Sequence, residues 1–97
     1  PGFRKVDIRV PKLPEEKLSW AKTRFNSPAG TIESYWKREN GKTMLVVTVP
    51  PNCSATVYFP DETGRSIREN SGLAKVAGKK NGYRLFEISS GNYIFEN

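Results

Sequence analysis

Hydrophobic and polar residues alternate with a period of two along most of this chain. Such alternation places apolar side chains on one face of a strand and polar side chains on the other, so it predicts half-buried β-strands. The segments that show it are 3–10, 18–25, 30–39, 42–49, 53–59, 83–88 and 92–96, with a shorter one at 67–69. No segment sustains a helical period, and we therefore expect an all-β protein.

The dipeptide Asn40-Gly41 stands between two of these segments and predicts a hairpin, because a two-residue turn requires positive φ at both positions. The register that follows pairs Glu39 with Lys42, Trp36 with Leu45, Ser34 with Val47 and Ile32 with Val49. One face of the hairpin then carries five large apolar side chains, and we predict that this face lies in the core. These residues are Ile32, Trp36, Leu45, Val47 and Val49.

Proline, glycine and asparagine separate the predicted strands, which recur about every 8–12 residues. This is the spacing of strands in an antiparallel sandwich. We predict a single domain over residues 1–97 with an antiparallel, Greek-key-like β-sandwich fold. A turn at Ser90-Gly91 would make a hairpin of the last two strands and set Phe86 beside Phe95. The alternating residues of segment 53–59 that should share one face are Cys53, Ala55, Val57 and Phe59.

The opposite face of the first hairpin is more apolar than a solvated sheet face should be. It carries Tyr35, Met44 and Val46 among polar residues, and we expect the outward-pointing Tyr58 to add to it. Two interpretations stay open at this point. The face is covered by a neighbouring domain of a larger protein, or it is a scatter of half-exposed side chains.

Several segments share their order and spacing with a known family. They are Ser27-Pro28-Ala29-Gly30 with Ile32 and Trp36, LVVTVPPNCSATVYFP at 45–60, Ile67 and Glu69 before Gly72, and Ser90-Gly91-Asn92-Tyr93 with Phe95. Together they resemble the C-terminal β-sandwich domain of bacterial α-L-rhamnosidases, which are glycoside hydrolases. Pro1-Gly2-Phe3 looks like the start of that domain's first strand. The segment 78–82 has no match in the resemblance and is unassigned.

The resemblance implies a role outside the reaction itself. The parent enzyme of this family hydrolyses terminal α-L-rhamnosides with inversion, and its catalytic carboxylates lie on a central α/α-barrel that precedes this domain. No catalytic residue is therefore expected here. The expected partners are the barrel of the same parent chain and, for the parent, a rhamnose-containing glycan. The chain begins at Pro1 rather than Met, and we expect it to be a piece of that larger protein.

Two other functions remain as alternatives. The first is a carbohydrate-binding module of a secreted glycan-degrading protein. The second is a basic β-barrel that binds single-stranded nucleic acid, suggested by the net charge of +6. Such a barrel needs aromatic residues interleaved with Lys and Arg, and only Trp20, Lys22 and Arg24 hint at this pattern. We expect no nucleic-acid partner. The compartment stays open between periplasm, extracellular space and cytoplasm.

The residue types present exclude several reaction mechanisms. The chain has no histidine, which excludes Ser-His-Asp and Cys-His catalysis and histidine metal sites. The single Cys53 has no second cysteine for a disulfide or a zinc site, and we expect it in the core. The longest mostly apolar run, 44–51, is far shorter than the ~20 residues of a membrane helix. We expect no cofactor, metal or membrane partner.

The remaining candidate residues are surface positions for contact with a neighbouring domain or a sugar. Flat aromatic side chains suit both kinds of contact. The candidates are Trp20, Tyr35, Met44, Val46, Tyr58 and Glu69. For Glu69, which stands shortly before Gly72, we favour a structural carboxylate that accepts hydrogen bonds from turn amides.

Overall fold

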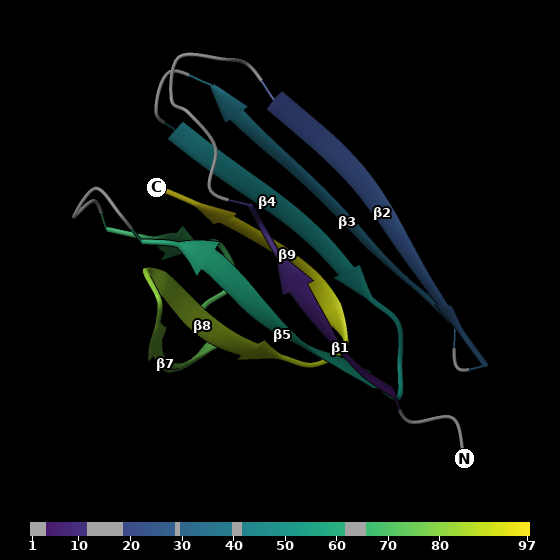
Figure 1. The fold of residues 1–97 in the computed structure, drawn as a ribbon. Coiled ribbons are helices and arrows are strands. Elements are labelled where there is room, and N and C mark those ends of the chain that lie inside the picture. The colour runs from purple at the N-terminus through teal and green to yellow at the C-terminus, as the bar shows by residue number, and fades with distance from the viewer. Residues whose placement is uncertain (1–3, 12–18, 29, 40–41, 62–65) are drawn as a thin grey trace.

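The computed structural model describes residues 4–11, 19–28, 30–39, 42–61 and 66–97, and these form two packed β-sheets (Figure 1). The strands are β1 (Arg4–Arg9), β2 (Ser19–Ser27), β3 (Gly30–Glu39), β4 (Lys42–Val49), β5 (Cys53–Pro60), β6 (Arg68–Glu69), β7 (Lys75–Lys80), β8 (Tyr83–Ile88) and β9 (Gly91–Glu96). The four-stranded sheet has the order β1-β5-β8-β7, and the five-stranded sheet has the order β2-β3-β4-β9-β6. The predicted all-β sandwich is confirmed.

The first hairpin has the predicted register. Glu39 lies opposite Lys42, Trp36 opposite Leu45, and Ser34 opposite Val47. The dipeptide Asn40-Gly41 lies outside the described residues. Of the predicted core face, Ile32, Leu45, Val47 and Val49 are buried, whereas Trp36 is half-buried and packs against the edge of the core.

The core lies between the two sheets and joins residues from both. Its buried members are Ile8, Val10, Ile32, Leu45, Val47, Val49, Cys53, Ala55, Val57, Phe59, Phe86, Ile88, Tyr93 and Phe95. Phe95 of β9 is at the centre of its aromatic part. The Phe95 ring centroid lies 5.0 Å from that of Phe86 and 6.4 Å from those of Phe59 and Tyr93. Since Phe59 and Phe86 belong to the four-stranded sheet, Phe95 holds the two layers together.

The predicted hairpin of the last two strands is wrong. β8 pairs with β5 in one sheet, and β9 pairs with β4 in the other, so the chain crosses between the layers after Ile88. Phe86 still meets Phe95, but it does so across the core. The alternation of apolar residues is the same for a hairpin and for such a crossing, and this is why the pattern could not separate them.

Two further features of the four-stranded sheet were not predicted. β1 pairs with β5 in parallel, so this sheet is mixed at one edge. The unassigned segment 78–82 contributes to an edge strand, β7, with a bulge between Val76 and Gly78. β7 is mostly exposed, so its sequence has little apolar alternation to reveal it. The available signal was the second Asn-Gly pair, since Asn81 and Gly82 form the β7–β8 turn with φ of 51° and 82°.

Candidate functional site

The outer face of the five-stranded sheet carries a contiguous group of apolar side chains. The cross-strand register runs from Tyr35 on β3 to Val46 on β4 and to Ile94 on β9. Met44 lies two residues from Val46 and therefore on the same face. Ile94 exposes 36% of its surface, and the other three residues are half-buried. We call Tyr35, Met44, Val46 and Ile94 the apolar face.

This face follows from strand alternation around the core. Leu45 and Val47 point into the sandwich and are fully buried, so Met44 and Val46 must point outward. A solvated outer face is normally polar, and the apolar face departs from that rule. Ile94 was absent from the predicted candidates because the last strand had been assigned to a hairpin with the segment 83–88.

Trp20 lies at the rim of this face, on the edge strand β2. It exposes 61% of its surface, and its ring centroid is 6.3 Å from that of Tyr35, with an angle of 42° between the ring planes. The two rings, together with Lys22 and Val46, line an open hollow of about 520 Å³. Four of the six predicted candidates, Trp20, Tyr35, Met44 and Val46, are thus brought together on one surface.

Tyr58 does not belong to this surface. β5 is part of the four-stranded sheet, so its outward residues face the opposite side of the sandwich, and the expectation that Tyr58 adds to the apolar face is wrong. There the guanidinium carbon of Arg9 lies 4.4 Å from the Tyr58 ring centroid and 5.5 Å from that of Tyr83. These cation–π contacts attach the edge strand β1 to its sheet.

Glu69 closes the turn after β6. Its Oε2 accepts hydrogen bonds from the Ser71 amide and hydroxyl, both at 2.7 Å, and its Oε1 accepts from the amides of Gly72 (2.9 Å) and Ala74 (3.3 Å). Partial burial acts to raise the pKa of Glu69, but these hydrogen bonds outweigh it and hold the pKa below its ordinary value of 4.5. This geometry is that of a carboxylate that accepts turn amides.

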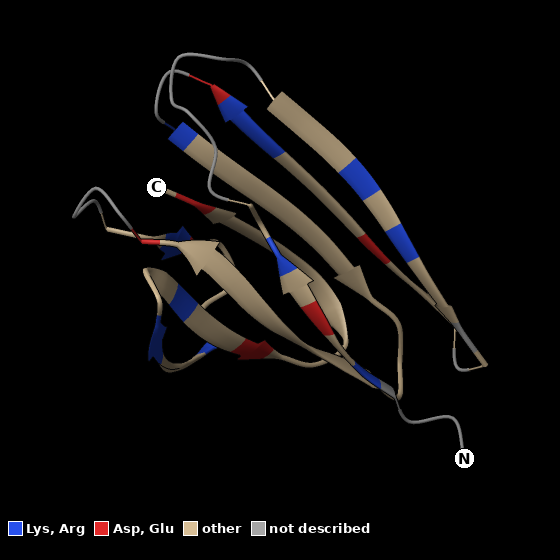
Figure 2. Ribbon diagram, in the orientation of Figure 1, with Lys and Arg blue, Asp and Glu red and all other residues tan. Residues whose placement is uncertain are grey.

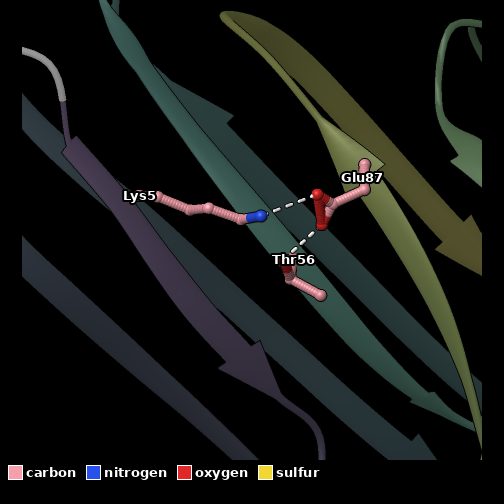
Figure 3. Close-up of polar contacts among 3 residues, drawn as sticks. All are labelled: Lys5, Thr56 and Glu87. Atoms are coloured by element: carbon pink, nitrogen blue, oxygen red, sulfur yellow. Dashed lines mark hydrogen bonds and ion pairs between the residues drawn. The ribbon is translucent and has the colours of Figure 1, made fainter. Parts of the chain in front are cut away.

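A second polar group lies on the outer face of the four-stranded sheet (Figure 3). The Thr56 hydroxyl donates a hydrogen bond to Oε1 of Glu87, and Lys5 Nζ lies 2.9 Å from Oε2. The Thr56 hydrogen bond, followed by the contacts with Lys5, lowers the pKa of Glu87 below 4.5 against the opposing effect of burial. The hydrogen bond and charge of Glu87 raise the pKa of Lys5 above 10.5.

Neutralising Glu87 should change the pH dependence of the free energy of unfolding. Because its pKa is lowered in the folded state, the Glu87 carboxylate stabilises the fold above pH 4.5, and this contribution is lost as the pH falls through the folded-state pKa. We expect Glu87→Gln to be less stable than the unmodified chain at neutral pH and to match it in strong acid. Urea unfolding at a series of pH values measures this difference. A constant difference across the acid range would contradict the assignment.

The other chemistry in the described part of the chain is structural. Asp61 Oδ2 lies 3.3 Å from Arg84 Nη2 and 3.8 Å from Lys79 Nζ. Cys53 is a buried free thiol. Among the described residues, His, Cys, Asp and Glu form no group of three or more that could hold a metal ion. The same residues include no helix of the length and hydrophobicity needed to span a membrane.

Together these features define a β-sandwich domain whose larger sheet has an apolar outer face. The family model described as the bacterial alpha-L-rhamnosidase C-terminal domain matches residues 1–74. This chain therefore belongs to the family of bacterial α-L-rhamnosidase C-terminal domains. The resemblance seen in the segments 27–36 and 45–60 is confirmed.

Relatives and solved structures agree with this family. The alpha-L-rhamnosidase of Streptomyces avermitilis is 31% identical over 94 residues, which are 97% of this chain and 9% of that protein. The alpha-L-rhamnosidase of Formosa agariphila is 31% identical over 61 residues, 63% of this chain and 7% of that protein. This chain thus spans less than a tenth of the length of these curated relatives.

Two solved structures share the fold. The crystal structure of Streptomyces avermitilis alpha-L-rhamnosidase complexed with L-rhamnose superposes with a TM-score of 0.76 at 23% identity, covering 94% of this chain and 9% of that one. The structure of alpha-L-rhamnosidase from Dictyoglumus thermophilum gives a TM-score of 0.66 at 24% identity, covering 79% of this chain and 9% of that one. In each case the match is confined to a small part of a longer chain.

Proposed function

We propose that this chain is the non-catalytic accessory domain of an α-L-rhamnosidase that hydrolyses terminal α-L-rhamnosides with inversion. Its membership of the family supports the parent activity. The relatives support its place within a longer chain, since this chain aligns with only 9% of the Streptomyces avermitilis protein. In this proposal the domain completes the fold of the parent and shields apolar surface of the catalytic part.

The observation that carries the proposal is the apolar face. We place the catalytic α/α-barrel of the same parent chain against Met44, Val46 and Ile94, whose side chains lie where a free sheet would be polar. Interfaces between domains of one chain bury about 600–1,500 Å². The barrel would therefore cover these residues together with their polar surroundings.

Three of the described carboxylates support the non-catalytic part of the proposal. Glycoside hydrolysis needs one carboxyl group that gives a proton and a second that activates water or attacks the sugar. Asp61 is paired with Arg84 and Lys79, Glu69 is held by turn amides, and Glu87 is held by Lys5 and Thr56. Each of these acids has a structural role.

The test compares the 97-residue chain with the complete polypeptide that contains it. Both are assayed for hydrolysis of 4-nitrophenyl α-L-rhamnopyranoside, and the anomeric configuration of the released sugar is followed by NMR. We expect turnover with inversion from the complete polypeptide and none from the 97-residue chain. Turnover by the short chain, or an inactive complete polypeptide, would refute the proposal.

A further inference from the structure

Next to Trp20, polar side chains lie along the outer face of β2, β3 and β4. The register places Lys22 opposite Tyr35 and Arg24 opposite Glu33, and Glu33 in turn lies opposite Thr48. Trp20, Lys22 and Arg24 therefore form one outward row on the edge strand, about 14 Å long at 3.4 Å per residue. Figure 2 shows the positive positions on β2 beside an acidic position on β3.

Two hollows adjoin on this surface and differ in chemistry. The aromatic hollow, of about 520 Å³, is lined by Trp20, Lys22, Tyr35 and Val46. The second, of about 190 Å³, shares Lys22, Tyr35 and Val46 with the first and adds five polar residues. The added residues are Thr23, Arg24, Glu33, Ser34 and Thr48. A flat aromatic surface is thus directly continuous with a group of hydrogen-bonding side chains.

The outward-pointing polar side chains of the second hollow are available to a ligand. Lys22, Arg24 and Glu33 form no ion pair with one another or with any other described residue. All three are exposed, as is Thr48. Lys22 Nζ lies 5.8 Å from the Tyr35 ring centroid, and Lys22 lines both hollows.

This combination matches the two surfaces of a pyranose sugar. The C–H groups of such a ring form an apolar face that packs on an indole, while its hydroxyls both donate and accept hydrogen bonds. Lys22 and Arg24 offer donors, Glu33 offers acceptors, and Thr48 offers both. The surface carries charges of both signs, two cations and one carboxylate, so it suits a ligand whose groups both donate and accept hydrogen bonds.

We propose that the two hollows form a binding site for a short neutral oligosaccharide, with one pyranose ring on Trp20 and the next among Lys22, Arg24, Glu33 and Thr48. This goes beyond the accessory role and does not depend on it. Because β2 is an edge strand, a barrel packed over Met44 of β4 and Ile94 of β9 leaves the Trp20 row accessible at the rim, and Val46 lies at the boundary between the two surfaces. Sugar binding and domain docking can therefore take place together.

Nitrogen-15 NMR of the 97-residue chain tests the site, because its two tryptophans give two indole N–H signals that report two different places. Trp20 is exposed in the aromatic hollow, whereas Trp36 packs against the core. The probes are L-rhamnose, rutinose (an α-L-rhamnosyl-glucose disaccharide) and maltose. We expect at least one disaccharide to shift the Trp20 signal saturably, with an affinity of about 1 mM, and to leave Trp36 unchanged.

Variants connect the signal to the proposed contacts. Trp20→Ala, followed by saturation-transfer NMR of the sugar, and the charge-balanced double variant Arg24→Ala/Glu33→Ala should each weaken binding by about tenfold or more. Leu73→Ala, which removes another exposed apolar side chain (69% exposed) outside the hollows, is the control and should bind normally. Failure of all three probes to shift Trp20, a shift of Trp36 instead, or normal binding by the double variant would overturn the proposal.

Discussion

Replacement of Phe95 by alanine is expected to lower the free energy of unfolding by about 3–5 kcal/mol. The Phe95 side chain is fully buried and contacts rings from both sheets, the closest being Phe86 at 5.0 Å between centroids. Its loss removes apolar burial and leaves a cavity where the layers meet. The free energy of unfolding of a small domain is only about 5–15 kcal/mol in total, so the variant should be largely unfolded on mild heating. Denaturant unfolding followed by fluorescence measures the change.

Ile94→Ala is the matched control for this substitution. Ile94 is the next residue to Phe95 on β9 but points outward, so we expect a loss of at most about 1 kcal/mol in the 97-residue chain. Equal losses for the two variants would mean that β9 does not present Phe95 to the core and Ile94 to the surface.

Ile94→Lys is expected to separate docking from folding. In the 97-residue chain the new ammonium group reaches water at a position that is already 36% exposed, so the change in stability should be small. In the complete polypeptide the same charge would be buried against the barrel, and we expect a loss of about 2 kcal/mol or more of docking free energy. Thermal unfolding and limited proteolysis of the complete polypeptide measure this loss.

Val76→Lys provides the control for charge and exposure. Val76 lies on the edge strand β7 of the other sheet and is 63% exposed. This variant should leave both the short chain and the complete polypeptide unchanged. If Ile94→Lys unfolds the short chain itself, then Ile94 belongs to the core and the apolar face is wrongly assigned.

The parts of the fold that local chemistry determines could be predicted from the sequence. Asn40-Gly41 predicted the register of β3 and β4 that the structure shows, because a two-residue turn allows a single pairing that buries Leu45 and Val47 together. The strict alternation in β5 identified Cys53 and its three partners as one buried face. The outward positions of Tyr35, Met44 and Val46 followed from the alternation within β3 and β4.

The remaining features depend on which strands become neighbours, and alternation carries no information about that. Phe86 and Phe95 were correctly expected to meet, but whether they meet along one sheet or across two depends on the packing of the whole sandwich. Because the sequence did not show which strands are neighbours, Tyr58 was assigned to the wrong surface. For the same reason Ile94 was not recognised as part of the apolar face. The second hollow, of about 190 Å³, was not predicted because Arg24, Glu33 and Thr48 come from three different strands.

The central claim is that Met44, Val46 and Ile94, on the outer face of the five-stranded sheet, are covered by the barrel of the parent chain. Met44, which is the single methionine of the 97-residue chain and lies on the apolar face, reports on this directly through its oxidation to the sulfoxide. Hydroxyl-radical footprinting with mass spectrometry compares Met44 in the short chain and in the complete polypeptide, with Val76 as the internal reference. We predict that Met44 reacts several-fold more slowly in the complete polypeptide while Val76 is unchanged. Equal reactivity of Met44 in the two forms would contradict the account.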